Sequence, residues 1–309
     1  MRLSKLLFTL LLLASFSACS VKRIAINKIG YALASGGSTY ERDDDPDLVA
    51  EALPFSLKLV ESLLAESPKH KGLLIAAASG FTEYTYAFVD QQADEAMVES
   101  VEQGRILRSR ARRLYLRAHE YGLRGLDATY PQFRAALDQD AETALARTRK
   151  RDVPLLYWTA TSLGLAISAS KSDPAMMAQL PLVEALIRRA SELDSSWGAG
   201  AVPEFLISVE NAKPGLKQSE KLERIRRHFE RSLQLSKGAH AGAFVSYAEN
   251  AAIPAQNRAE FQSVLEKALA IDTASHPEGR LANIVAQRRA RWLLGRIDEL
   301  FIENATSQR

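Results

Sequence analysis

Residues 183–194, VEALIRRASELD, have the pattern of an amphipathic helix. Apolar residues recur at helical spacing, and charged residues occupy the opposite side. The apolar positions are Val183, Leu186, Ile187, Ala190 and Leu193. The same periodicity returns over residues 225–235, 261–271 and 281–301, and the last of these predicts one long helix. Because no alternating apolar and polar run between turn residues stands out, the predicted fold class is all-α.

A short, degenerate sequence unit recurs along the chain. It consists of a small or apolar residue, an apolar residue three positions later, and then a polar residue. The copies are Leu123-Leu126-Asp127, Ala190-Leu193-Asp194, Ser232-Leu235-Ser236 and Ala268-Ile271-Asp272, with starts separated by 67, 42 and 36 residues. The last two spacings are close to the tetratricopeptide (TPR) period of roughly 34 residues, although the Trp and Gly of a strict repeat are missing. We therefore expect a TPR-like solenoid of helical hairpins with a concave face or channel, in which Leu193, Leu235 and Ile271 are buried.

The composition is that of an ordinary globular chain. Of 309 residues, 47% are hydrophobic and 25% are charged, which excludes wholesale disorder and a polytopic membrane protein. Without the two basic residues of the leader described below, the chain has 38 basic and 37 acidic residues. This balance gives no support to nucleic-acid binding. The single cysteine excludes an intrachain disulfide and a cysteine-cluster metal site.

The N-terminus resembles a bacterial lipoprotein leader. A basic n-region precedes eleven nearly all-apolar residues, 6–16, which as a helix rise about 16 Å, roughly half of a bilayer's hydrocarbon thickness. This length fits a secretory leader rather than a membrane anchor. The Ser17-Ala18-Cys19 that follows resembles a lipobox, although Phe16 stands where leucine is commonest. A plain signal peptide followed by a free cysteine is the alternative.

The lipobox implies a signal peptide over residues 1–18 and a mature chain that begins at a triacylated Cys19. Because Ser20 rather than aspartate follows the cysteine, the usual Gram-negative sorting rule favours the outer membrane. The protein is thus expected on the periplasmic face of a membrane, held by lipid. Residues 19–45 are expected to be an anchored segment and linker, and residues 46–309 a single helical domain.

The start of that domain has a capping signal. Asp45 and Pro46 resemble the N-cap and the first turn of a helix.

Motifs of common enzyme classes are missing from the sequence. It has no P-loop, no G-x-G-x-x-G and no G-x-S-x-G run, and its five histidines lack metal-ligand spacing. The acidic run at 43–47 lacks the pattern of a calcium-binding loop, which favours a solvated helix cap. We therefore predict no enzymatic activity, no catalytic residues, no metal and no cofactor.

Arginines crowd two predicted helices, over residues 105–117 and 288–296. They could form an anion-binding surface or pair with acids of their own or neighbouring helices, for example Arg117 with Glu120. We favour pairing.

Aromatic residues on the first helices of presumed pairs are the candidate ligand contacts. We expect the rings of Tyr84, Trp158, Phe205 and Tyr247 to surround a common cavity on the concave face. Glu204 and Glu249 are the candidate polar anchors beside them. Packing of the same rings in ordinary cores is the alternative.

Segments throughout the chain resemble the T component (TatT family) of tripartite ATP-independent periplasmic (TRAP) transporters. They include DDDPDLVAEALPFSLKLVESLLAESP (43–68), SGFTEYTYAFV (79–89), RARRLYLRAHEYGLRGL (110–126), VLEKALAID (264–272) and RRARWLL (288–294). The resemblance implies a lipid-anchored, all-helical homotrimer that partners a periplasmic solute-binding P component. It further implies a hydrophobic ligand, which can carry a carboxylate, and supplies no catalytic residues. A TPR-like scaffold for an envelope complex, without a small-molecule ligand, remains the alternative.

Overall fold

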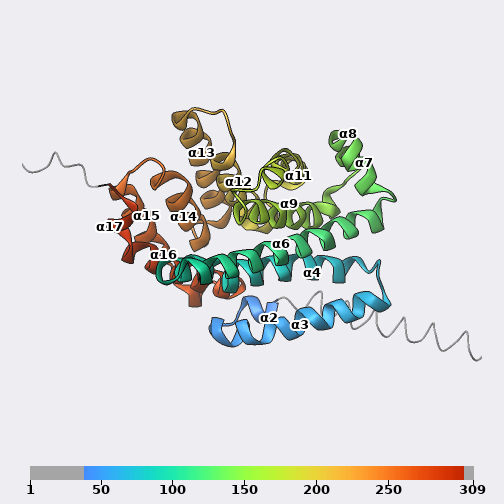
Figure 1. Cartoon of the computed structure of the whole chain (residues 1–309), viewed down its shortest axis with the longest axis horizontal. Helices are drawn as coiled ribbons and strands as arrows, with labels where there is room; N and C mark the ends of the chain where they lie inside the picture. The colour runs from blue at the N-terminus through green and yellow to red at the C-terminus, as the bar shows by residue number, and fades with distance from the viewer. Residues whose placement is uncertain (1–37, 303–309) are drawn as a thin grey trace, which may run out of the picture.

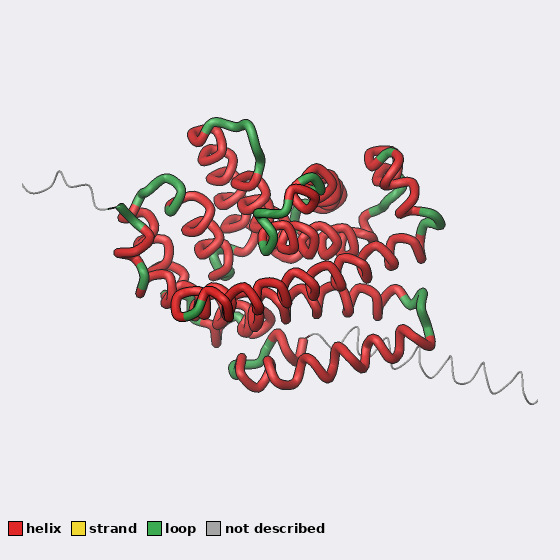
Figure 2. The backbone as a smooth tube through the Cα atoms, in the orientation of Figure 1, coloured by secondary structure: helices red, strands yellow, loops and turns green. Residues whose placement is uncertain are grey.

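The computed structural model describes residues 38–302, and Cys19 and the expected leader lie outside this range. Every regular element within it is helical, and the described tube contains no strand (Figure 2). The predicted all-α class is confirmed.

Ten helices make up most of the fold (Figure 1). They are α3 (Pro46–Glu66), α4 (Lys71–Thr85), α5 (Gln91–Glu99), α6 (Val101–Thr129), α9 (Val153–Ser168), α11 (Leu180–Asp194), α12 (Ala201–Ala212), α13 (Gln218–Ser236), α15 (Arg258–Leu269) and α16 (Arg280–Gly295). Shorter α-helices lie between and beside them: α2 (Ser38–Glu41), α7 (Phe133–Gln139), α8 (Ala141–Ala146), α10 (Pro174–Met177), α14 (Ala241–Tyr247) and α17 (Ile297–Leu300).

Two π-helical turns extend α4 and α14. These are η1 (Tyr86–Asp90) and η4 (Ala248–Ala252), and such turns are frequent at functional sites. The remaining elements are the 3₁₀ turns η2 (Lys150–Asp152), η3 (Trp197–Gly200), η5 (Thr273–Ser275) and η6 (Pro277–Gly279).

Most helices pack on elements close to them in the chain. The main contacts are α3 with α4, α4 and α5 with α6, α6 with α9, α9 with α11, α12 with α13, and α14 with α15 and α16. In Figure 1, α6 runs across the middle of the molecule, with α4 and α9 along its two sides. Stacked helical hairpins produce this order of contacts. The TPR-like solenoid itself stays a prediction.

Three buried apolar cores hold the described residues together. One contains Leu163 and Leu186 and extends from η1 to α12. Another, around Phe261, joins α12 to the C-terminal helices. The third, around Leu73 and Leu74, joins α3, α4 and α6. Consecutive helices are therefore held by burial of the apolar stripes that their periodicity predicts.

Two glycines allow α6 and α9 to approach closely. A Cβ atom on Gly122 would lie 2.2 Å from Oγ1 of Thr159, and one on Gly125 would lie 2.4 Å from Cδ2 of Leu155. At Gly122 the close atoms include the backbone of α9, whereas at Gly125 they all belong to the Leu155 side chain. The crossing of the two helices therefore depends most on glycine at position 122.

The cap predicted before α3 is confirmed. The Asp45 side chain accepts hydrogen bonds from the backbone N–H groups of Asp47 (3.1 Å) and Leu48 (3.0 Å), and Pro46 occupies the first helical position. Just before this cap, α2 occupies part of the segment that was expected to be a linker.

The prediction of one helix over residues 281–301 is wrong. The helix α16 ends at Gly295, and the separate turn α17 follows. Arg296 leaves helical geometry, with φ −113° and ψ 17°. Glycine is the poorest ordinary helix former, which favours the end of α16 at Gly295. The turn that follows brings the Phe301 ring to 5.0 Å from that of Phe261 in a buried contact. Burial of Phe301 in the C-terminal core thus accompanies the break.

Leu193, Leu235 and Ile271 are half-buried, so the prediction that they are buried is wrong. Each lies within or just beyond the last turn of its helix. The fully covered positions come a turn or more earlier, at Leu186 on α11 and Leu265 on α15. A terminal turn has fewer neighbours, which is why the end of an apolar stripe is covered less well than its middle.

The two ends of the helical array meet. Arg288 of α16 donates hydrogen bonds to both carboxylate oxygens of Asp47, at 2.7 and 3.0 Å. Arg280 lies 3.6 Å from Asp44, and Arg289 donates to Asp94 of α5 at 2.7 Å. We call this junction of α16 with α2, α3 and α5 the seam. It joins residues that are more than 190 positions apart in the chain.

Candidate ligand-binding face

Tyr157 of α9 is the centre of an aromatic cluster. Its ring centroid lies 4.9 Å from that of Trp158, 4.7 Å from Trp197 of η3 and 6.3 Å from Phe205 of α12. Trp158 and Trp197 meet edge to face at 6.4 Å. Trp158 and Phe205, two of the predicted ligand contacts, are thus brought into one group, and both are only half-buried.

Tyr84 lies on α4, which packs against α9. It is half-buried and packs against the same two apolar cores as Trp158. Its ring is 5.9 Å from that of Phe88, and its hydroxyl accepts a long hydrogen bond from Arg110 at 3.4 Å. Three of the four predicted rings therefore come from facing helices of one region.

Tyr247, the fourth predicted ring, belongs to a different group. It lies in the C-terminal core, stacks on Phe229 at 4.4 Å, and donates a hydrogen bond to Glu260 at 2.8 Å. Only 3% of the residue is exposed. The structure does not bring it to the other three rings, because its side of α14 packs against α13 and α15.

Glu204 precedes Phe205 on α12 and is half-buried. Its Oε1 atom lies 2.5 Å from the position that a Cβ on Gly242 of α14 would occupy, so the carboxyl fits where that glycine has no side chain. Desolvation raises the pKa of Glu204 to about 7. Within residues 38–302 this carboxyl has no hydrogen bond or ion pair.

Glu83 of α4 is a second such carboxyl, and the sequence analysis missed it. Water reaches its side chain, yet desolvation by the surrounding protein, followed by the charge of Glu41, raises its pKa to about 8. Both observations fit a group that lies in a concave surface, where protein surrounds it but does not cover it. The signal in the sequence was an isolated acid: after Lys71, Glu83 is the only charged residue of α4.

The two carboxyls lie within electrostatic range of the aromatic cluster. Burial raises the pKa of the Tyr157 hydroxyl, and the charges of Glu204 and Glu83 add to this effect. We call Glu83, Tyr157, Trp158, Glu204 and Phe205 the inner face. It combines aromatic surface with two carboxyls that lack a partner among the described residues. Such a surface can bind an apolar body and hydrogen-bond one polar end.

Glu249, the other predicted anchor, is already paired. Its Oε1 accepts hydrogen bonds from Arg289 at 2.6 and 3.0 Å, and the same guanidinium bonds Asp94. Arg108 bridges Asp94 and Asp90 on the other side. Glu249 therefore belongs to an ionic network at the seam rather than to the inner face.

Tyr86 of η1 connects the inner face with the seam. It is 40% exposed, yet desolvation raises the pKa of its hydroxyl, and the charges of Glu249, Arg289 and Glu204 also act on it. Groups from both regions therefore lie within electrostatic range of this ring.

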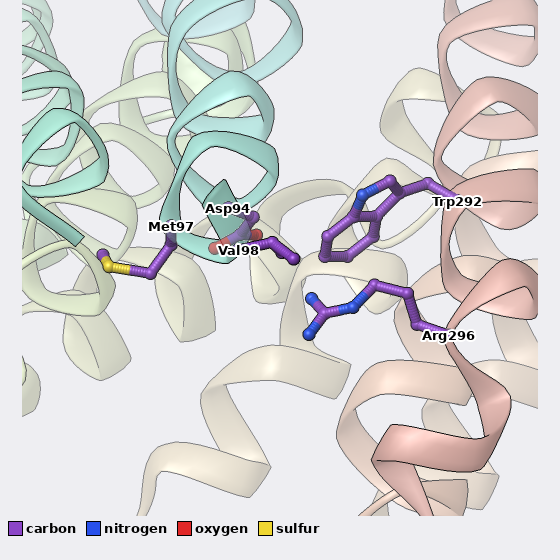
Figure 3. A pocket seen from close by; sticks show the side chains of 5 residues that line it. All are labelled: Asp94, Met97, Val98, Trp292 and Arg296. Atoms are coloured by element: carbon purple, nitrogen blue, oxygen red, sulfur yellow. The ribbon is translucent and has the colours of Figure 1, made fainter. Parts of the chain in front are cut away.

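A pocket of about 180 Å³ lies on the seam between α5 and α16. Figure 3 shows Trp292 of α16 and Arg296, the residue after α16, extending towards Val98 of α5. Two guanidinium groups lie over the Trp292 ring, that of Arg289 at 4.4 Å and that of Arg296 at 4.8 Å from its centroid. A second pocket, of about 340 Å³, lies between α11, α12 and α13, with Ile187, Leu206, Val209, Glu210, Lys213 and His228 among its lining residues.

Arginines of both clusters pair with acids, as favoured from the sequence, but one named partner is wrong. Arg117 contacts Glu61 of α3 at 2.5 Å, whereas Glu120 pairs with Arg134 at 2.7 Å. The side chain of Arg117 points across to α3 because its face of α6 packs there, near the Tyr121 hydroxyl that also bonds Glu61. The spacing of residues within α6 therefore does not predict which acid Arg117 pairs with.

Residues 38–302 contain no group of three or more histidine, cysteine, aspartate or glutamate residues placed to hold a metal ion. In the same range, no helix combines the length and the apolar character needed to span a membrane.

The two inner carboxyls should make stability pH-dependent. Their folded-state pKa values of about 8 (Glu83) and about 7 (Glu204) exceed the ordinary value, so from about pH 4.5 upward the unfolded chain ionises while the folded chain stays protonated. Stability should therefore fall as pH rises through this window. We expect Glu83→Gln and Glu204→Gln to raise the thermal midpoint relative to wild type more at about pH 8 than at about pH 5. Glu95→Gln, at an exposed site on α5, is the control and should show no such trend.

The fold and its inner face define an all-helical protein in which neighbouring helices carry aromatic rings and two carboxyls without a partner among residues 38–302. Comparison with known proteins narrows this class to one family. The chain belongs to the TRAP transporter T-component family, whose sequence model matches residues 42–301. It is also similar to an uncharacterized protein of Treponema pallidum (strain Nichols), with 30% identity over 305 residues that cover 93% of this chain and 94% of that protein. The resemblance expected from the sequence is confirmed, and the protein has an accessory role in TRAP transport.

Proposed function

We propose that the protein is a non-enzymatic, lipid-anchored accessory that binds a hydrophobic solute at its inner face and docks the periplasmic solute-binding P component of a TRAP transporter. The observation that carries this proposal is the grouping of half-buried aromatic rings with two unpartnered carboxyls. Burying an aromatic or aliphatic side chain contributes about 1.5–3 kcal/mol, and the same gain is available to an apolar solute.

The raised pKa values of Glu83 and Glu204 support a solute with a polar, oxygen-bearing end. Near neutral pH a large share of these carboxyls is protonated, and a protonated carboxyl donates a hydrogen bond. The acceptor can be a solute carboxylate, which would be repelled if both glutamates were ionised. A hydrophobic solute with a carboxylate end therefore remains compatible with an acidic site.

The attachment, location and assembly belong to the same proposal. The lipobox at Cys19 supports lipid anchoring on the periplasmic face, in the outer membrane. Exposed apolar side chains support association with a partner or with other protomers in a trimer. They lie on α3, at Leu48, Phe55 and Leu59, and around the start of α6, at Val98, Val101 and Ile106.

A structural scaffold without a small-molecule ligand is the second candidate. The packing of Tyr247 into a separate core supports it, because the four predicted rings do not surround one cavity. The two candidates differ in whether the purified protein binds an apolar solute.

The test is titration of the full chain with the fluorescent fatty acid cis-parinaric acid. We expect saturable binding, and Trp158→Ala should weaken it about ten- to hundredfold, since the loss of one buried aromatic contact is worth about 1.5–3 kcal/mol. Phe55→Ala, at an exposed ring on α3, is the matched control and should bind as wild type does. Unchanged affinity in Trp158→Ala would contradict the inner face as the site. Failure of the wild type to bind would favour the scaffold.

A further inference from the structure

The seam differs in kind from the other helix junctions of the fold. None of the three buried cores of the described residues contains both a residue of α16 and a residue of α2, α3 or α5. Met97 and Val98 of α5 and Trp292 of α16 line an open pocket of about 180 Å³ there (Figure 3). Val49 of α3, Ala93 of α5 and Val285 of α16 are buried, but they belong to none of the three cores. The seam therefore shares none of the apolar cores that join consecutive helices.

Ion pairs join the two sides of the seam. The pair of Arg288 with Asp47 is exposed, whereas in the pair of Arg280 with Asp44 only the carboxylate is exposed. Exposed pairs contribute little to stability, and salt screens them. Arg289 is the partly buried member, with 11% of its side chain exposed, and its Nη1 atom has no hydrogen-bond partner. Separation of the seam accordingly breaks ion pairs and divides none of the three apolar cores.

The seam also adjoins the inner face. Arg289 of α16 donates hydrogen bonds to Glu249 of η4 at 2.6 and 3.0 Å, and η4 extends α14, whose Gly242 lies against the Glu204 carboxyl. Tyr86 and Glu249 are both carried by π-helical turns, η1 and η4, which are common where a helix serves a function. A separation at the seam would thus uncover the region that leads to Glu204.

We propose that the seam is an ionic gate, which opens between α16 and helices α2, α3 and α5 to let the solute enter and leave the inner face. This inference rests on the proposed function, because it concerns the route of the solute bound there. The closed state is the one described, with Arg288 on Asp47 and Arg289 on Asp94. Opening breaks these contacts and leaves the three apolar cores intact.

The first test links the seam covalently. In full-length protein, Asp47→Cys and Arg288→Cys are joined by a short bismaleimide, and release of bound cis-parinaric acid is followed by stopped flow. The linked protein should release the probe at least about tenfold more slowly, as expected when a gating motion is blocked. Each single cysteine variant, treated identically, is the control and should not be slowed. Release from the linked protein at the rate of the singles would overturn the gate.

The second test loosens the seam. Arg288→Gln should release the probe about two- to fivefold faster, because one exposed ion pair contributes a free energy of that size. Release from the wild type should become faster with added salt, because salt screens the pair. Arg231→Gln, which removes an exposed arginine from α13, is the matched control and should not change the rate. A rate in Arg288→Gln equal to that of wild type would contradict the proposal.

The third test needs no solute and so separates the gate from the proposed function. Spin labels at Glu51→Cys on α3 and Arg291→Cys on α16 leave the ion pairs intact, since both side chains are exposed and belong to none of the seam pairs. Added salt should populate a second, longer distance between the labels. A single distance that does not respond to salt would overturn the gate even if the probe binds. A salt-dependent opening without any probe binding would instead contradict only the solute-binding function.

Discussion

Lipid attachment should be lost completely when Cys19 is replaced with serine. A thiolate is the nucleophile that forms the thioether to diacylglycerol, and a serine hydroxyl cannot replace it under the same conditions. We expect no incorporation of radiolabelled palmitate and retention of the uncleaved leader. The full-length variant is compared with wild type by labelling cells and by the mass of the purified chain.

Ser20→Ala is the control for this experiment, because it changes the neighbouring residue and keeps the thiol. It should be labelled as wild type is. Equal palmitate labelling of Cys19→Ser and wild type would contradict the lipoprotein assignment.

The largest expected loss of stability comes from Gly122→Leu. A Cβ at this position would lie 2.2 Å from Oγ1 and 3.2 Å from the backbone Cα of Thr159, a fully buried residue of α9. A leucine side chain there must push α6 and α9 apart. Overpacking a core usually costs about 1–3 kcal/mol, and we expect the upper end of this range or more because backbone is in the way. The midpoint of urea or thermal unfolding measures it.

Gly295→Leu is the matched control for that variant. No atom lies within 4 Å of a Cβ built on Gly295, so the same substitution has room and should change stability by no more than about 0.5 kcal/mol. If Gly122→Leu were as stable as Gly295→Leu, the close approach of α6 and α9 would be contradicted.

The helices and some of their ends could be predicted from the sequence, because these are local properties. Spacing of apolar residues such as Leu186 and Ile187 predicts a helix without knowledge of its partner. The cap at Asp45 depends only on the next three residues. The end of α16 at Gly295 was missed because an apolar stripe continues past it, and the burial of Phe301 against Phe261 accompanies the break.

The candidate site was predicted only in part. Trp158 and Phe205 are together, since Trp158 follows Tyr157 on α9 and Phe205 lies on α12, which packs against α9. Tyr247 is also an aromatic residue on a predicted first helix. It nevertheless packs in another core, because its side of α14 faces that core. Glu83 was detectable as a lone acid in an apolar helix, but its raised pKa comes from the surrounding protein rather than from its sequence neighbours.

The sequence by itself determined the all-helical class, the family and the amphipathic face of most helices, because each depends on residues within a few turns of one another. Only the tertiary structure decided that Arg288 meets Asp47 and that Arg289 joins Asp94 to Glu249. Arg288 and Asp47 are 241 positions apart. Whether they meet depends on the summed crossing angles of all the helices between them, and no local pattern in the chain records that sum.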